Sequence, residues 1–276
     1  MRHAFRSDGV AWVMLGALLC LGAIVVTTIA AEGGGALPAA AISNALDWQA
    51  ALGLREPWRL WTCAWVHGSV AHLLVNVAGG GVVAFVGWRG RVPLAATLAW
   101  FLAWPCTQLL MAAIDSERLA AAMPHYFGLS GVLHAGVVVL GLSLAWPRAP
   151  VRPRAPATAR ADTGFAATRA SAIEPSRLTE GPWAMTELGA ATALSVSTLD
   201  QPPASADDDR PMRVRWIGVA ILAGTLAKVV LEAPWSLAPR PSEALGIAVA
   251  PVAHACGIGA GLLAWTTLRL AARRQR

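Results

Sequence analysis

The sequence has few charged residues, and carboxylates are nearly absent from its apolar blocks. Only 14% of the 276 residues are charged, whereas 56% are hydrophobic, and the mean hydropathy is +0.52. Soluble domains carry about a quarter charged residues, so this composition excludes an ordinary soluble domain. The apolar residues are gathered into blocks, which indicates a polytopic membrane protein.

Cysteine is also scarce, and the common metal motifs are missing. The four cysteines are scattered and no C-x-x-C pair occurs, so no disulfide framework is indicated. Cys63 remains a candidate reactive thiol near the outer surface. Without an H-E-x-x-H motif we expect no metal and no cofactor, although four imidazoles leave a metal site as an alternative. These imidazoles belong to His67, His72, His134 and His254.

The net charge of +6 and the isoelectric point near 10.1 do not indicate a nucleic-acid partner. The arginines lie at the ends of apolar blocks and in one long polar segment, and they form no basic face with interleaved aromatic residues. Membrane topology therefore explains them better.

Six blocks approach the roughly 20 apolar residues that cross a bilayer. The blocks are Val10–Ala31, Val70–Trp88, Val92–Ile114, Phe127–Trp146, Trp216–Leu231 and Ala244–Leu270. The first is too long for a signal-peptide core and lacks a cleavage site, so we expect a retained span. The fifth is the weakest because it contains Lys228. The predicted fold is an all-α membrane protein with a bundle of six transmembrane helices.

The arginines predict the orientation of this bundle. Thirteen arginines that flank the predicted spans fall on one side if both chain termini are cytoplasmic, as the positive-inside rule requires. They are Arg2, Arg6, Arg89, Arg91, Arg148, Arg152, Arg154, Arg160, Arg213, Arg215, Arg273, Arg274 and Arg276. The opposite loops carry Asp115, Glu117, Glu232 and Glu243.

Residues 147–212 differ from the rest of the chain. They are rich in Pro, Ala, Ser, Thr and Arg, and they cannot bury enough apolar surface to fold alone. We therefore expect a disordered cytoplasmic insertion between residues 1–146, with spans one to four, and residues 213–276, with spans five and six. The mildly apolar stretch Trp183–Leu199 offers an alternative, since its crossing would reverse the last two spans.

Ser130 is a candidate nucleophile. It lies in Gly128-Leu129-Ser130-Gly131, where the glycines leave the serine uncrowded and let a substrate approach the backbone. We expect it at the start of the fourth span, where free N–H groups and the helix dipole favour a developing oxyanion. A small residue that only packs between helices is the alternative.

His254 is the candidate base. Counted from the outer end of the sixth block, it lies about ten residues in, or ~15 Å along the axis. An ionisable residue at such depth faces the bundle interior and is functional by default. Gly257, Gly259 and Gly261 leave one face almost bare, so this helix can press against the fourth span. Helix packing with an incidental histidine is the alternative.

Other polar residues share the faces of these helices. His72 and Asn76 are four residues apart in the second span, so both can donate to an oxyanion. His67 lies near the interface and can bond a loop. His134 lies one turn beyond Ser130 and can pack against His254 or orient it. Lys228 and Glu232 can neutralise each other near the outer end of the fifth span.

Together these residues resemble the rhomboid family of intramembrane serine proteases. His67-x4-His72-x3-Asn76 is similar to its H-x4-H-x3-N motif, and Gly128-Leu129-Ser130-Gly131 to its G-x-S-G motif. His254-x2-Gly257-x3-Gly261 resembles the motif in the last span of the family. Trp58-Arg59 resembles the tryptophan–arginine signature in its first outer loop. Within the family the chain is most similar to rhombosortases, in Gly128-Leu129-Ser130-Gly131-Val132-Leu133-His134 and in the Lys228 and Glu232 pair.

The resemblance implies a six-helix bundle around a water-filled cavity in a bacterial inner membrane, with the active site toward the periplasm. Ser130 and His254 would be the catalytic residues of a dyad without a carboxylate, which agrees with the expected absence of any Asp or Glu near His254. His72, Asn76 and the Ser130 backbone N–H would hold the oxyanion, with His67, Gly128, His134 and Gly257 in support. The implied substrates are exported proteins anchored by a C-terminal Gly-Gly motif, one apolar span and a basic tail.

Two other functions stay open on sequence grounds. A non-catalytic rhomboid-like protein would bind transmembrane segments without cleaving them, and both candidate catalytic residues argue against it. A small transporter would use the histidines as a proton relay, but the spans are almost free of charge.

Overall fold

The computed structural model describes residues 9–32, 39–114, 116–146 and 212–275. The predicted insertion at 147–212 lies outside these ranges except for Met212, which begins a helix. The described chain is mostly helical with little sheet, as expected for an all-α membrane protein. Its helices are α1 (Val10–Glu32), α2 (Ala39–Leu46), α3 (Arg59–Thr62), the 3-10 turn η1 (Cys63–Trp65), α4 (Val70–Arg89), α5 (Leu94–Ala112), α6 (Ser116–Ala122), α7 (Ser130–Ala145), α8 (Met212–Leu231) and α9 (Pro251–Arg274).

Among the described residues, five helices are long and apolar enough to cross a membrane, and they are α1, α4, α5, α8 and α9. The block expected at Phe127–Trp146 forms a shorter helix, α7, of 16 residues. It starts at Ser130 because His125–Tyr126 form a short strand and the chain then turns at Gly128, whose φ is +115°. At 1.5 Å per residue α7 is about 24 Å long, less than the roughly 30 Å of a hydrocarbon core.

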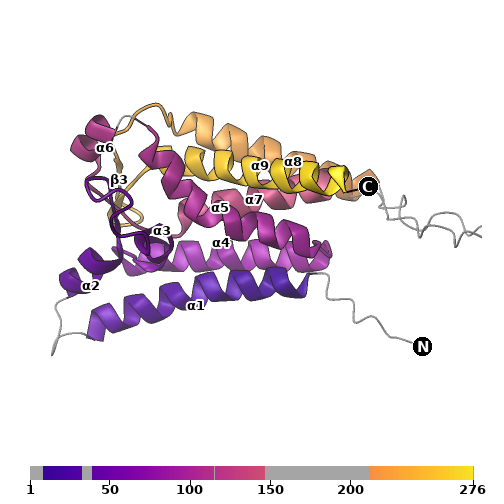
Figure 1. The fold of residues 1–276 in the computed structure, drawn as a ribbon. Coiled ribbons are helices and arrows are strands. Elements are labelled where there is room, and N and C mark those ends of the chain that lie inside the picture. The colour runs from indigo at the N-terminus through magenta and orange to yellow at the C-terminus, as the bar shows by residue number, and fades with distance from the viewer. Residues whose placement is uncertain (1–8, 33–38, 115, 147–211, 276) are drawn as a thin grey trace, which may run out of the picture. The chain divides into compact units, whose positions relative to one another are not determined.

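Helix α7 lies at the centre of the bundle and contacts α4, α5, α8 and α9 (Figure 1). Most of its residues are buried, with no polar face. Trp100 of α5 fits against Gly136 of α7 and donates its indole N–H to the Val132 carbonyl at 2.9 Å. Because the neighbouring helices cover α7 on several sides, its first residue, Ser130, is held by the best-packed part of the protein.

The close approach of α9 to α7 that the glycines predict is present. A Cβ atom on Gly257 would lie 2.0 Å from the Gly131 carbonyl oxygen, and one on Gly261 would lie 2.6 Å from the Ala135 carbonyl oxygen. Small residues at a helix interface permit such backbone contact, and the resulting van der Waals packing holds membrane helices together.

Two short ribbons lie at the end of the bundle that also carries α2, α3 and α6 (Figure 1). Strand β1 (Trp48–Gln49) pairs antiparallel with β2 (His125–Tyr126), and β3 (Arg240–Ser242) pairs antiparallel with β4 (Ile247–Val249). Each ribbon leads into a helix that carries a candidate residue, because β2 precedes α7 with Ser130 and β4 precedes α9 with His254.

The opposite end carries basic residues. The turn from α4 to α5 holds Arg89 and Arg91, and its Val92 carbonyl accepts from the Gly9 N–H next to the start of α1. Arg215 of α8 donates to the Ala145 carbonyl at the end of α7, which places the start of α8 at this end too. This grouping agrees with the arginine pattern from which the orientation was predicted.

The contact between α7 and α9 predicts that replacing two glycines of α9 by alanine has very different effects on stability. Gly257→Ala places a methyl group against backbone that cannot move aside, so we expect a loss of about 1–3 kcal/mol of stability. Gly259→Ala is the matched control, because its Cβ would meet only the Leu110 side chain at 3.4 Å. Thermal unfolding in detergent measures both variants, and equal melting temperatures would contradict the proposed packing.

Candidate active site

A cavity of about 870 Å³ opens at the end of the bundle that carries the two ribbons. Its wall is mostly apolar. The polar residues that four helices and the end of α8 contribute are His72 and Asn76 of α4, Ser130 and His134 of α7, Thr225 and Lys228 of α8, Glu232 directly after α8, and His254 of α9. The two ribbons add His125 and Tyr126 of β2 and Arg240 and Ser242 of β3 to the lining. The cavity thus contains all the histidines and amides proposed from the sequence except His67.

Ser130 is the first residue of α7, so its backbone N–H belongs to the open helix end. The turn before it depends on Gly128, where a Cβ atom would lie 2.6 Å from the His72 ring. The Gly128 N–H donates to the Cys63 carbonyl at 2.9 Å, which ties this turn to η1. Both the positive φ and the close ring require glycine at this position.

His254 lies in the first turn of its helix, which corrects the predicted depth of ten residues. Helix α9 begins at Pro251, and residues 247–249 of the expected span form β4 instead. The proline explains the late start, because it is disfavoured inside a helix and favoured in the first turn. The His254 side chain is 5% exposed, and its Nε2 lies 3.0 Å from Ser130 Oγ.

The expected absence of a carboxylate near His254 is wrong. Glu232 Oε2 lies 2.7 Å from His254 Nδ1. The two residues are 22 positions apart, and Glu232 meets the ring because the late start of α9 brings His254 to the level at which α8 ends. Ala233 follows with a φ of 49°, so the chain turns away immediately after the carboxylate.

The predicted pair of Lys228 and Glu232 forms as well, with Nζ 2.5 Å from Oε1. Burial raises the pKa of Glu232, but hydrogen bonds from His254 and Lys228 outweigh that effect and lower the pKa to about 2. Glu232 is therefore a carboxylate at neutral pH, and each of its oxygens has a separate partner.

These partners define how the protons are arranged. Since the ionised carboxylate only accepts, His254 Nδ1 carries the proton that it donates to Glu232. A neutral His254 ring then has a lone pair on Nε2, which accepts the Ser130 hydroxyl proton. This is the arrangement that a general base needs before it activates a serine.

His134 stacks on His254 with ring centroids 4.2 Å apart and an interplanar angle of 18°. Its Nδ1 lies 2.7 Å from the Ser130 carbonyl oxygen and therefore donates the proton. Its Nε2 faces Lys228 Nζ at 3.4 Å. The prediction that His134 packs against His254 is confirmed, and the stacking leaves the His254 ring little freedom to rotate.

His72 and Asn76 lie on one face of α4, and the side chains of both are buried beside the cavity. His72 Nδ1 has no hydrogen-bond partner among the described residues. Asn76 Nδ2 lies 3.1 Å from His67 Nε2, while His67 Nδ1 donates to the Trp65 carbonyl at 3.2 Å. Burial lowers the pKa of His67, so a neutral His67 holds one amide proton of Asn76 and leaves the other available.

The remaining sequence candidates lie elsewhere. Cys63 is fully buried rather than near the surface, and burial raises the pKa of its thiol to about 12, so it is not a reactive thiol. Among the residues that the structure describes, no group of three or more His, Cys, Asp or Glu side chains could hold a metal ion.

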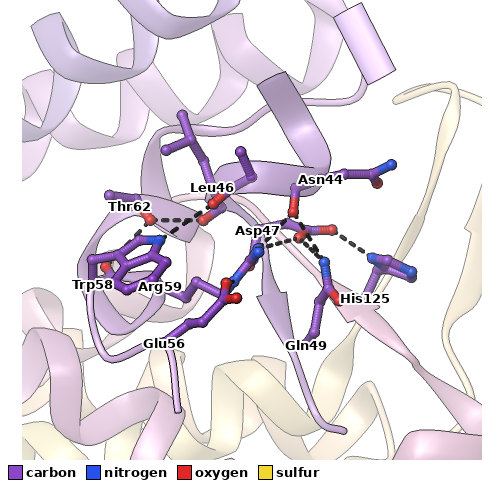
Figure 2. A network of polar contacts seen from close by, with 10 residues as sticks. Asn44, Leu46, Asp47, Gln49, Glu56, Trp58, Arg59, Thr62 and His125 are labelled. Atoms are coloured by element: carbon purple, nitrogen blue, oxygen red, sulfur yellow. Dashed lines mark hydrogen bonds and ion pairs between the residues drawn. The ribbon is translucent and has the colours of Figure 1, made fainter. Parts of the chain in front are cut away.

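A polar network that sequence reasoning missed supports the segment before Ser130 (Figure 2). Asp47 is 2% exposed and binds Arg59 Nη1 at 3.0 Å and His125 Nδ1 at 2.6 Å. Arg59 also donates to the Asn44 and Asp47 carbonyls at 2.7 Å and to Glu56 at 2.5 Å. Because His125 belongs to β2, the network joins the segment between α1 and α4 to the strand that precedes α7.

The two residues of the loop-1 signature have different environments. Arg59 is buried in this network, whereas Trp58 is 50% exposed and donates to the Ala45 carbonyl. Asp47 and His125 are 78 residues apart and give no local sequence signal. Of this network, only Arg59 could therefore be identified as a candidate from the sequence.

No protein-family model, curated protein or solved structure matches this chain.

The Arg59 network predicts that its planar guanidinium cannot be replaced by an ammonium group. Arg59→Lys keeps the charge but loses the fork of hydrogen bonds, so we expect a loss of about 1–3 kcal/mol of stability. Arg55→Lys is the control because Arg55 is exposed in the same loop. Thermal unfolding in detergent compares them, and an Arg59→Lys variant as stable as the control would refute the structural role.

Proposed function

We propose that the protein is an intramembrane serine endopeptidase of the rhomboid type, most similar in its motifs to rhombosortases. The observation that carries this proposal is the 3.0 Å contact between Ser130 Oγ and His254 Nε2 in a mostly apolar cavity. The proton arrangement adds support, since it leaves the accepting lone pair of a neutral His254 on the nitrogen that faces the serine.

The proposed reaction begins with attack by Ser130 Oγ on the substrate carbonyl carbon, as His254 Nε2 takes the hydroxyl proton. The tetrahedral intermediate then collapses, the carbon–nitrogen bond breaks, and His254 returns the proton to the leaving amine. In the second half a water molecule attacks the acyl-enzyme and releases Ser130. If another amine replaces water, the product carries an amide instead of a carboxylate, and mass spectrometry distinguishes the two.

The oxyanion of this reaction needs donors near Ser130. We assign this role to the Ser130 backbone N–H, His72 and Asn76. The helix start supports the first assignment. The burial of both side chains beside the cavity supports the other two, since donors fixed in a dry site stabilise developing charge strongly.

The form of the cavity supports a substrate that enters as an apolar transmembrane segment. Beyond the polar residues the cavity continues along α7, with apolar walls from α4 and α7. On α4 these wall residues run from Val75 to Val83, which corresponds to about 12 Å of helix. An extended or locally unwound segment would fit this space better than a soluble peptide, because its side chains could replace lipid.

The motif resemblance narrows the proposed substrates to exported proteins with a C-terminal tag of Gly-Gly, one span and a basic tail. The two glycines would lower the cost of unwinding the tag so that Ser130 reaches a carbonyl. We further propose that α7 acts as a sixth, short span in the bacterial inner membrane. Both termini would then be cytoplasmic and the site would lie toward the periplasm, so the product is released outside the cytoplasm.

Removal of either reacting residue should abolish activity. We expect Ser130→Ala and His254→Ala to end cleavage of a tagged periplasmic reporter, and the double variant to be no worse than either, because the two residues act as one unit. Ser130→Ala should also lose labelling by a fluorophosphonate probe. Insertion and melting temperature are measured in parallel to show that the variants fold.

Two results would refute this proposal. Full reporter cleavage by Ser130→Ala would exclude the serine mechanism. A folded wild-type protein that neither reacts with the probe nor cleaves the reporter would favour a non-catalytic binder of transmembrane segments.

The oxyanion assignment predicts intermediate losses. His72→Ala and Asn76→Ala should each lower turnover on the order of a hundred- to a thousandfold, with residual activity above that of Ser130→Ala. Leu74→Ala on the same helix is the control, since its side chain is 61% exposed and does not line the cavity. Normal turnover of Asn76→Ala would mean that its amide only supports His67.

A further inference from the structure

Glu232 stands in the cavity beside both proposed reacting residues. One carboxylate oxygen accepts from His254 Nδ1 at 2.7 Å and the other from Lys228 Nζ at 2.5 Å. From this geometry we infer, on the basis of the proposed function, that Glu232 is a positioning residue that completes a triad with His254 and Ser130.

A carboxylate at this position has two effects on a histidine base. It accepts the Nδ1 proton and thereby keeps the lone pair on Nε2, toward Ser130. It also stabilises the positive charge that His254 acquires when it takes the serine proton. Both effects act through His254, because no contact joins Glu232 to Ser130 directly in the described structure.

A structural ion pair with Lys228 does not account for this geometry. The Lys228 side chain is 52% exposed, and an exposed pair four residues apart on a helix contributes little to stability. The contact with His254 is different, because that side chain is 5% exposed. The buried hydrogen bond to His254 therefore restricts the position of the Glu232 carboxylate most strongly. Lys228 binds the second carboxylate oxygen.

Lys228 also connects Glu232 to the other side of the site. Its Nζ faces His134 Nε2 at 3.4 Å, and His134 donates to the Ser130 carbonyl. The polar contacts thus close a ring from Ser130 Oγ through His254, Glu232, Lys228 and His134 back to the Ser130 backbone. Among the residues of this closed set of contacts, only Glu232 supplies an acceptor to His254 Nδ1.

The chain on both sides of Glu232 fits this role. Ala233 turns the backbone in the left-handed region directly after it, and the β3–β4 ribbon returns the chain to α9. Ser69, which caps α4 three residues before His72, donates its hydroxyl to the Leu245 carbonyl in the loop of this ribbon. Contacts from α4 therefore hold the connection that brings Glu232 and His254 together.

The test compares Glu232→Gln with Lys228→Met in the purified full-length protein. Glu232→Gln keeps the shape but allows the amide to donate to Nδ1, so we expect kcat to fall on the order of a hundredfold or more with KM nearly unchanged. Because the stacking with His134 still holds the His254 ring in place, we expect the fall in kcat to be close to a hundredfold. Lys228→Met should cost only a few-fold. Glu243→Gln, an exposed carboxylate between the strands, is the control.

Chemical rescue provides a readout that a structural role would not alter. Glu232→Ala opens a space that reaches the cavity, so millimolar formate should restore much of the rate of fluorophosphonate labelling, whereas formamide should not. This measurement also serves if Glu232→Gln folds poorly, since it compares one variant with itself.

The outcomes separate this inference from the proposed function. An active wild type with a Glu232→Gln variant as active as Glu243→Gln would overturn the triad and leave the endopeptidase intact. Equal losses in Glu232→Gln and Lys228→Met, without formate rescue, would reduce Glu232 to a structural ion pair. A wild type without activity or probe labelling would refute both.

Discussion

The site depends on the direct contact between the backbones of α7 and α9. Gly257 and Gly131 allow the helices to approach so closely that no Cβ atom fits between them. His254 lies one turn before Gly257, and Ser130 lies one residue before Gly131. Backbone packing therefore sets how closely the Cα atoms of Ser130 and His254 approach, and the side-chain rotamers place Oγ 3.0 Å from Nε2 within that limit. The long side chains around the cavity only refine an arrangement that the glycines have already fixed.

A second constraint is the direction in which the hydrogen bonds run. Lys228 is the only lysine in the sequence, and its ammonium group can only donate. Lys228 donates to Glu232, His254 Nδ1 donates to the same carboxylate, and Ser130 Oγ then donates to His254 Nε2. Each proton in this series has one position. Two further histidines are also fixed, since His134 and His67 each donate from Nδ1 to a carbonyl. The Glu232 carboxylate thus assigns the tautomer of His254, and the Ser130 and Trp65 carbonyls assign those of His134 and His67.

Much of this organisation could be predicted from the sequence because hydropathy and arginine placement are strong signals in membrane proteins. Five expected spans form helices, and Ser130 begins a helix as expected. The errors come from the segments between helices. Pro251 delays α9, so His254 was placed too deep, and the meeting of Glu232 with His254 could not be foreseen from a separation of 22 residues. Asp47 and His125 were missed for the same reason, since tertiary contacts alone bring them together.

Helix α8 is the least buried of the five long helices and contacts mainly α7. It carries Lys228 and leads directly into Glu232, whereas Ser130 and His254 belong to helices locked against each other. An outward tilt of α8 would widen the cavity toward the lipid and, in the same movement, withdraw the carboxylate from the imidazole. Under the proposed function, access to the site from the lipid and proton transfer by His254 are therefore opposed, because one movement affects both.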